Sequence, residues 1–130
     1  MDLEKVVAKD IMSTDVVTFD ENQSLNLVEL VAEAKHVRHV PIVNSERHPV
    51  GVLGIRDFLR HFSTPGSSHF IPIKDIIERK VVSCYPTDSL QSVANKMYEN
   101  EVSAVVVIED QKIVGILTEH DFLLALLGKK

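Results

Sequence analysis

The chain has 130 residues, of which 45% are hydrophobic and 25% charged, and these values are typical of an ordinary globular domain. Its formal net charge of −5 argues against a general nucleic-acid-binding protein, because such proteins usually present a basic face. The single cysteine, Cys84, excludes an internal disulfide and argues against a structural zinc site, so we expect a cytoplasmic protein. The sequence shows no signal peptide and no apolar run long enough to span a bilayer, so we expect no membrane partner.

The sequence contains an internal duplication. A shift of 65 positions, which aligns residue 9 with residue 74, superimposes many identical residues, and the match continues after one skipped residue near His48. The identities include Lys9-Asp10-Ile11 with Lys74-Asp75-Ile76, Ser24-Leu25 with Ser89-Leu90, Val50-Gly51 with Val114-Gly115, and Asp57-Phe58-Leu59 with Asp121-Phe122-Leu123. A match sustained over about sixty residues indicates two copies of one structural unit.

The first copy has a clear order of elements. A short β-branched strand is predicted at residues 16–18, and a helix is predicted to begin near Ser24, which is a good N-cap residue. A continuous apolar run at residues 40–43 predicts a strand buried on both faces. A polar turn leads from it into a strand at residues 50–53, so we expect a hairpin, followed by a helix over residues 55–62.

The second copy repeats these elements after a linker. Residues 63–68 are rich in turn-forming residues and are the only convincing linker. Beyond them we predict a strand at residues 81–83, a helix from Ser89, a hairpin over residues 104–117 and a helix over residues 119–127. In each copy, the helix after the first strand supplies the crossover that a parallel strand pair requires.

These elements define the expected fold. We predict an α/β (α+β-like) protein in which the order strand, helix, strand, strand, helix occurs twice. The first repeat is assigned to residues 1–62, the linker to residues 63–72 and the second repeat to residues 73–130.

Three segments resemble a known family. Gly115-Ile116-Leu117-Thr118-Glu119-His120-Asp121 resembles the signature of CBS domains, which consists of glycine, two apolar-biased positions, Thr or Ser, two variable residues and Asp. His39-Val40-Pro41-Ile42-Val43 resembles the strand that precedes this signature, and Lys9-Asp10-Ile11-Met12 resembles the opening segment of such domains. The resemblance covers both copies.

The resemblance implies a regulatory ligand-binding module. Two CBS repeats would pack about a pseudo-twofold axis and leave two clefts that bind adenosine ligands such as AMP, ADP, ATP, S-adenosylmethionine or NAD. By position, Asp121 would hold the ribose hydroxyls, Thr118 would contact phosphate or ribose, and Asp57 would hold the ribose of the other cleft. A carboxylate suits this role because it only accepts hydrogen bonds, and the helix start at Thr118 favours a phosphate.

The same resemblance implies further site residues and partners. The adenine would be framed by Val17, Thr18, Val82, Ser83, His39, Val40, Pro41, Ala104 and Val105. Charge against a phosphate would come from residues near the clefts in sequence, namely Arg56, His120, Arg38 and His39. For Arg38 and Arg56 the default interpretation is a solvated surface position. The implied assembly is a homodimer that acts on a regulated protein of unknown identity. The target is expected to be a separate protein, and the alternatives are that the chain is a fragment of a larger protein or a free-standing sensor. We expect no required cofactor and no enzyme activity, because neither copy shows a nucleophile or base with an orienting group.

Other interpretations of these residues stay open. Thr118 and Asp121 also have the spacing of a helix capping box. The first copy has Gly54 at the Thr position yet keeps Asp57, and we take this to indicate that the acid does more than complete a cap. Because Gly54 lacks the hydroxyl, we expect the Asp121 cleft to bind better. One ligand per chain is the expectation, and two ligands per chain is the alternative. The alternative function is a dimerisation or partner-docking module that binds no ligand.

Several residues receive a purely structural interpretation. Gly51 and Gly115 are expected to be packing glycines rather than parts of a phosphate-binding loop. Cys84 aligns with an apolar position, so we expect buried filler rather than a nucleophile. His36 and His39 are expected to end a helix and begin a strand, where they would not share a metal ion.

Overall fold

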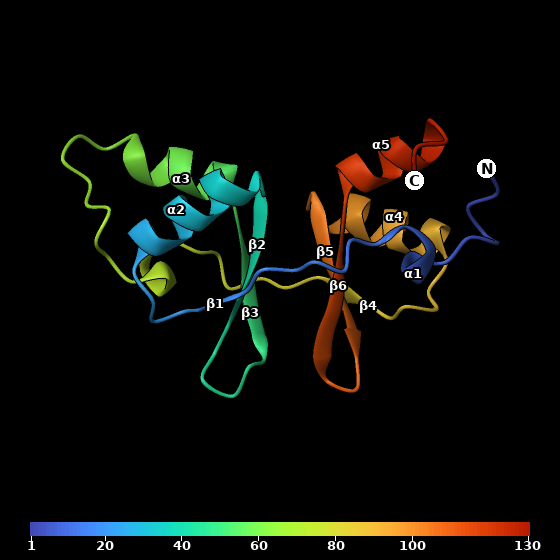
Figure 1. The fold of residues 1–130 in the computed structure, drawn as a ribbon, viewed down its shortest axis with the longest axis horizontal. Coiled ribbons are helices and arrows are strands. Elements are labelled where there is room, and N and C mark those ends of the chain that lie inside the picture. Colours follow the sequence, from blue (N-terminus) through green and yellow to red (C-terminus); the bar gives the residue numbers. More distant parts are fainter. The chain divides into compact units, whose positions relative to one another are not determined.

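The computed structural model, which describes residues 1–130, contains one three-stranded sheet in each copy of the repeat (Figure 1). The first sheet has the order β1 (Phe19–Asp20), β2 (His39–Val43) and β3 (Pro49–Gly54), and the second has the order β4 (Ser83–Cys84), β5 (Ala104–Glu109) and β6 (Lys112–Thr118). In both sheets the first two strands are parallel and the last two are antiparallel. The predicted class and the doubled order of elements are therefore confirmed.

The crossover helices begin where the sequence predicts. Helices α2 (Leu25–Lys35) and α4 (Leu90–Asn100) follow Ser24 and Ser89, and the Oγ of Ser89 accepts a hydrogen bond from the Ser92 N–H at 3.1 Å. Both helices end at a residue with left-handed backbone, His36 (φ 56°) and Glu101 (φ 54°). The N–H of each end residue returns to carbonyls of the last turn, and this bonding closes the helix.

The last helix of each copy follows its strand without a loop. Helix α3 (Ile55–Phe62) starts directly after Gly54, and helix α5 (Glu119–Leu126) starts directly after Thr118. Two short helical segments, α1 (Ala8–Ile11) and the 3₁₀ turn η1 (Ile73–Asp75), precede the first strand of each copy. Each helix of this protein is too short, or too polar, to cross a bilayer.

The first strand of each copy lies later than predicted. The ladder starts at Phe19, which pairs with Ile42, and at Ser83, which pairs with Val106. Residues 16–18 lie outside the ladder, so the strand predicted there is wrong by a few residues. Paired valines favour extended backbone, but a strand is defined by hydrogen-bonded pairing, and the pairing with β2 and β5 begins only at Phe19 and Ser83.

The chain folds into two compact units that do not follow the order of the sequence. One unit consists of Met1–Val16 together with Val81–Lys130, and the other consists of Val17–Lys80. The opening segment of the first copy therefore completes the core beneath the second sheet, where Ala8 and Ile11 pack with Val105 and Leu117. The repeat boundaries given above stay a prediction, since they describe the duplication and not this grouping.

The same exchange occurs in the other unit. Ile73 and Ile77, from the opening segment of the second copy, pack with Leu25, Ile42 and Leu53 beneath the first sheet. Backbone hydrogen bonds fix both segments: the N–H of Ser13 donates to the Ile116 carbonyl at 2.9 Å, and the N–H of Leu25 donates to the Ile71 carbonyl at 2.8 Å. Each sheet is thus completed by the opening segment of the other copy.

Two glycines allow these segments to approach. A Cβ atom at Gly51 would stand 2.8 Å from the Glu78 carbonyl oxygen, and one at Gly115 would stand 3.1 Å from the Ser13 carbonyl oxygen. Both distances are too short for ordinary contact. The opening segments can therefore approach the sheets at these positions only because glycine has no side chain. The prediction that Gly51 and Gly115 serve packing is confirmed.

Candidate functional site

Asp121 is a buried carboxylate at the start of α5, with 4% of its surface exposed. Its Oδ2 accepts hydrogen bonds from the Thr118 N–H at 2.9 Å and from the Thr118 Oγ1 at 3.1 Å. In return, the Thr118 Oγ1 accepts from the Asp121 N–H at 3.3 Å. The capping box considered from the sequence is therefore present, and it leaves Oδ1 as the oxygen that faces away from the cap.

The second oxygen of Asp121 is held by two residues that lie far away in the sequence. Lys130 Nζ donates to Oδ1 at 2.6 Å, and Ser13 Oγ donates to the same oxygen at 3.4 Å. Lys130 Nζ also donates to Ser13 Oγ at 3.0 Å. The carboxylate thus has a counter-charge of its own, which offsets the cost of burying it.

Asp57 occupies the matching position at the start of α3, with 9% of its surface exposed. Its Oδ2 accepts from the Gly54 N–H at 2.7 Å, and its Oδ1 accepts from Arg60 Nη2 at 2.7 Å. Asp57 therefore still caps its helix although Gly54 has no hydroxyl. The backbone half of the cap is thus present without a hydroxyl, and a role of Asp57 beyond capping stays a prediction.

Arg60 is fixed from several sides. Besides Asp57, its guanidinium donates to the Ile76 carbonyl at 3.0 Å and lies 3.6 Å from a carboxylate oxygen of Glu78. The Arg60 guanidinium beside Asp57 is therefore part of a network, whereas the Lys130 ammonium group beside Asp121 contacts Asp121 and Ser13. The two acids are equivalent in the fold but differ in how firmly their counter-charge is bound.

The strand register brings other predicted site residues beside the two acids. His39 pairs with Gly54 across β2 and β3, and Ala104 pairs with Thr118 across β5 and β6. In each unit, the start of the apolar strand therefore lies next to the start of the last helix. Each acid is in this way placed at the end of its sheet where the predicted adenine-framing strand begins.

The remaining predicted residues fall into three groups. Val40 and Val105 belong to the hydrophobic cores, so a ligand could reach only their backbone. Arg38, Arg56 and His120 are exposed, and Val17, Thr18, Val82 and Ser83 are half-buried near the first strands, while Pro41 is fully buried. The placement of a ligand against all these residues, in clefts of the module, stays a prediction.

Sequence reasoning missed three residues that contact the acids: Ser13, Arg60 and Lys130. Arg60 stands one helical turn after Asp57, a spacing at which acid–base pairs form, and this signal was available. Ser13 and Lys130 carry no such signal, because their contacts with Asp121 arise only from the tertiary fold.

The structural interpretations of Cys84 and the histidines are confirmed. Cys84 is buried, and burial, together with the negative charge of Asp88, raises the pKa of its thiol to about 11, which makes it inert near neutral pH. His36 caps the end of α2 and His39 begins β2. No group of three His, Cys, Asp or Glu side chains is arranged to hold a metal ion.

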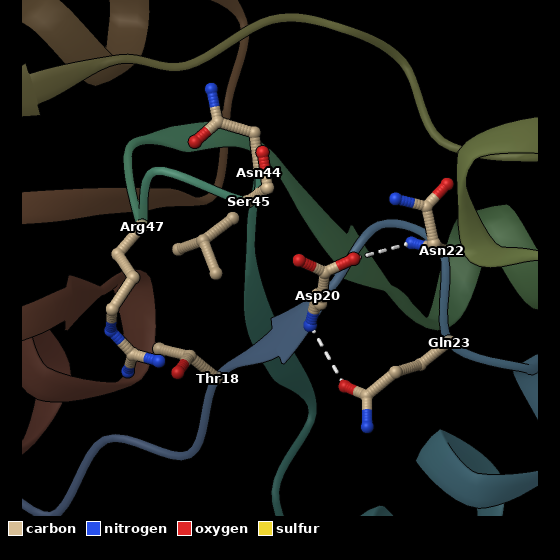
Figure 2. A pocket seen from close by; sticks show the side chains of 8 residues that line it. Thr18, Asp20, Asn22, Gln23, Asn44, Ser45 and Arg47 are labelled. Carbon is tan, nitrogen blue, oxygen red and sulfur yellow. Dashed lines mark hydrogen bonds between the residues drawn. The ribbon is translucent and has the colours of Figure 1, made fainter.

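Two hollows are found in the unit Val17–Lys80. An apolar one of about 520 Å³ lies against α2 and α3 and is lined in part by Arg38, Val40 and Phe58. A polar one of about 470 Å³ lies at the carboxyl ends of the parallel strands β1 and β2. There the Arg47 side chain extends from the hairpin toward Thr18, as Figure 2 shows. Neither hollow contains Asp57.

The fold defines a duplicated α/β module, and comparison with known sequences identifies its family. The model of the CBS domain matches residues 8–64 and 73–128. The chain therefore belongs to the CBS-domain family, as a tandem pair, and such pairs are typically regulatory.

Curated relatives contain this pair as part of a longer protein. A homoserine O-acetyltransferase of Methanohalobium evestigatum is 27% identical over 120 residues, which make up 92% of this chain and 24% of the relative. Protein MJ1225 of Methanocaldococcus jannaschii is 31% identical over 120 residues, or 92% of this chain and 42% of the relative. The chain thus spans less than half of the length of either relative.

Solved structures match the chain over nearly its whole length. The CBS domain pair of protein MJ0100, in complex with 5′-methylthioadenosine and S-adenosyl-L-methionine, is 27% identical with a TM-score of 0.84, and the match covers 96% of this chain and 98% of that chain. A conserved protein from Pyrococcus horikoshii is 25% identical with a TM-score of 0.85, covering 97% and 95%. A similar CBS pair therefore binds adenosyl ligands.

Proposed function

We propose that this chain is a regulatory module that senses an adenosyl ligand, with Asp121 as the acceptor for the ribose hydroxyls. The observation that carries the proposal is the position of Asp121, a buried carboxylate at a helix start beside the first residue of an apolar strand. A carboxylate can accept hydrogen bonds from both hydroxyls of one ribose. The binding of methylthioadenosine and S-adenosylmethionine by the similar pair of protein MJ0100 supports the same ligand class.

The ligand candidates are AMP, ADP, ATP, NAD and S-adenosylmethionine, to which methylthioadenosine is now added. Thr118 lies at the N-terminus of α5, where the helix dipole favours a phosphate, and His120 is exposed on the first turn of that helix. In the first copy Asp57 is paired with the anchored Arg60. We infer one ligand for each chain, bound at Asp121.

Binding would act on a partner through differential affinity. A ligand shifts a conformational equilibrium only to the extent that it binds one state more tightly than the other. The partner would be either a separate protein or another part of a longer chain, since the curated relatives carry the pair inside larger proteins. The module itself is proposed to be non-catalytic, to need no cofactor and to work in the cytoplasm.

A second candidate function is dimerisation or partner docking without a ligand. It is favoured by apolar side chains that remain more than half exposed on the helices. They are Leu30 on α2, Ile55 and Leu59 on α3, and Leu123 and Leu126 on α5. A homodimer that covers these side chains is compatible with either function, so ligand binding is the property that separates the two.

Calorimetric titration tests the proposal. The purified chain is titrated with each of the six ligands, and binding of at least one with a stoichiometry of one is expected. Asp121→Asn should weaken that binding by more than about tenfold, because a buried carboxylate is replaced by an amide. Asp88→Asn is the matched control, since Asp88 caps a turn at the Tyr85 N–H in the same unit. No heat with any ligand at millimolar concentration would leave only the docking function.

A further inference from the structure

Lys130 occupies the oxygen of Asp121 that a ribose would need. Thr118 uses Oδ2 for the helix cap, so Oδ1 is the acceptor left for a ligand. Lys130 Nζ donates to that oxygen at 2.6 Å, and the lysine side chain is itself only 25% exposed. An adenosine ligand can therefore reach Oδ1 only if the ammonium group moves aside.

The local backbone explains how the lysine reaches this position. Gly128 has φ 72°, a left-handed conformation that glycine adopts at low cost, and it reverses the chain after α5. The N–H of Gly128 then donates to the Ala125 carbonyl at 3.1 Å, and the N–H of Lys129 donates to the Leu124 carbonyl at 2.8 Å. The chain is thus turned back toward the helix, and the side chain of Lys130 reaches Asp121 in the first turn.

Displacing the lysine has a consequence for the charge of the ligand. The hydroxyls of a ribose can replace the hydrogen bonds of Lys130, but they cannot replace its positive charge. A neutral nucleoside would leave the buried carboxylate without its counter-charge, which is costly. A ligand with a phosphate next to the ribose gives the displaced ammonium group a new anionic partner, so the lysine stays in the site.

A comparison with Asp57 in the first copy shows why the counter-charge can move aside only at Asp121, in the second copy. Arg60 contacts Asp57, the Ile76 carbonyl and Glu78, and it is therefore held by groups that a ligand at Asp57 would not remove. Lys130 forms an ion pair with Asp121 alone, and its four-carbon side chain is flexible. Its ammonium group can follow a ligand, whereas the guanidinium of Arg60 is fixed.

We propose that Lys130 is a specificity-determining residue that makes the Asp121 site prefer adenosine 5′-phosphates over neutral adenosyl ligands. This proposal rests on the proposed function. It assigns two roles to one side chain: Lys130 competes with the ribose for Asp121, and it binds the phosphate once the ribose has taken its place.

The test compares AMP with 5′-methylthioadenosine, which carries the same ribose without a charge. Dissociation constants for both are measured by calorimetry on the unchanged chain, on Lys130→Gln and on Lys129→Gln. Lys129 is the matched control, because it neighbours Lys130 and the side chains bonded to Asp121 are those of Ser13, Thr118 and Lys130. Lys130→Gln is expected to bind methylthioadenosine more tightly and AMP more weakly, so that the preference for AMP falls by about tenfold or more, the value of one charge-assisted hydrogen bond. Lys129→Gln should leave the preference unchanged.

The outcomes separate the two proposals. If both ligands bind and Lys130→Gln changes neither constant, or changes both by the same factor, the role of Lys130 is wrong while the site at Asp121 stands. If no ligand binds any of the three chains, the proposed function fails, and this inference fails with it. A thermal melt of each variant confirms that it is folded before it is titrated.

Discussion

Gly115 lies directly against Met12, because a Cβ atom at position 115 would stand 2.5 Å from the Met12 Sδ. Met12 belongs to the opening segment of the first copy, and Gly115 belongs to β6 in the second sheet. The contact therefore links two parts of the sequence that are about a hundred residues apart. It shows that the opening segment of one copy is structurally a part of the other copy's sheet.

Gly115→Ala is expected to destabilise the protein. The added methyl group meets Met12 and the Ser13 carbonyl, so the free energy of unfolding should fall by about 1–3 kcal/mol, as in other overpacked sites. Urea unfolding measures the change. The double variant with Met12→Ala should recover part of the loss, because the closest obstacle is then removed. If the changes in the free energy of unfolding caused by the two substitutions were strictly additive, the two residues would not be in contact.

The exchange of opening segments predicts where a core substitution acts. Ile11→Ala removes a side chain that is 4% exposed and packs in the core under β5 and β6, and it should cost about 2–5 kcal/mol. Amide hydrogen exchange should lose protection first in β5 and β6. Ile73→Ala is the matched variant, and it should loosen β2 and β3 instead. The reverse pattern would mean that each copy folds on its own opening segment.

Gly54→Thr is expected to stabilise the first copy. The backbone at Gly54 is extended (φ −126°), and no atom lies closer than 3.6 Å to the position of an added Cβ. Thr would supply the hydroxyl that caps α5 in the second copy and would reduce the freedom of the unfolded chain, so a gain of about 0.5–1 kcal/mol is expected. Thr118→Gly is the reciprocal change and should lower stability. Denaturant midpoints that move in the opposite directions would contradict the capping account.

Cys84 should react only when the protein unfolds. Burial raises the pKa of its thiol from 9.0 to about 11, so the folded protein keeps the neutral thiol at pH 8. The resulting stabilisation is complete below pH 9 and is lost as the pH rises toward 11, because the unfolded chain then ionises first. Modification by a thiol reagent at pH 8 should therefore follow the unfolding rate. Fast modification of the native protein, at a rate independent of denaturant, would show that the thiol is accessible.

The internal duplication was sufficient to predict most of the fold. The starts of the crossover helices at Ser24 and Ser89, the apolar strands and the direct passage from strand to last helix are local features, so the pattern identified them. The exchange of opening segments was not predicted, because two aligned copies do not reveal which segment completes which sheet. The first strands were placed too early, since the ladder depends on the partner strand and not on the valines alone.

The candidate site was predicted in part. Asp57 and Asp121 were identified as candidates because the family signature and the duplication both mark them. In the structure, each carboxylate accepts a hydrogen bond from the backbone N–H of the residue that precedes its helix. Ser13 and Lys130 were missed because their contacts with Asp121 span 108 and 9 residues and need the folded chain. The hydrogen bond from the Gly54 N–H to Asp57 was not predicted, because the sequence pattern shows only that the hydroxyl is missing.

The binding of the ribose by Asp121 is tested most directly by a crystal structure with AMP or 5′-methylthioadenosine. We predict electron density for the ligand with a ribose hydroxyl within about 3 Å of Asp121 Oδ1 and with Lys130 Nζ displaced from that oxygen. A ligand bound elsewhere, with the contact between Lys130 and Asp121 intact, would contradict the account.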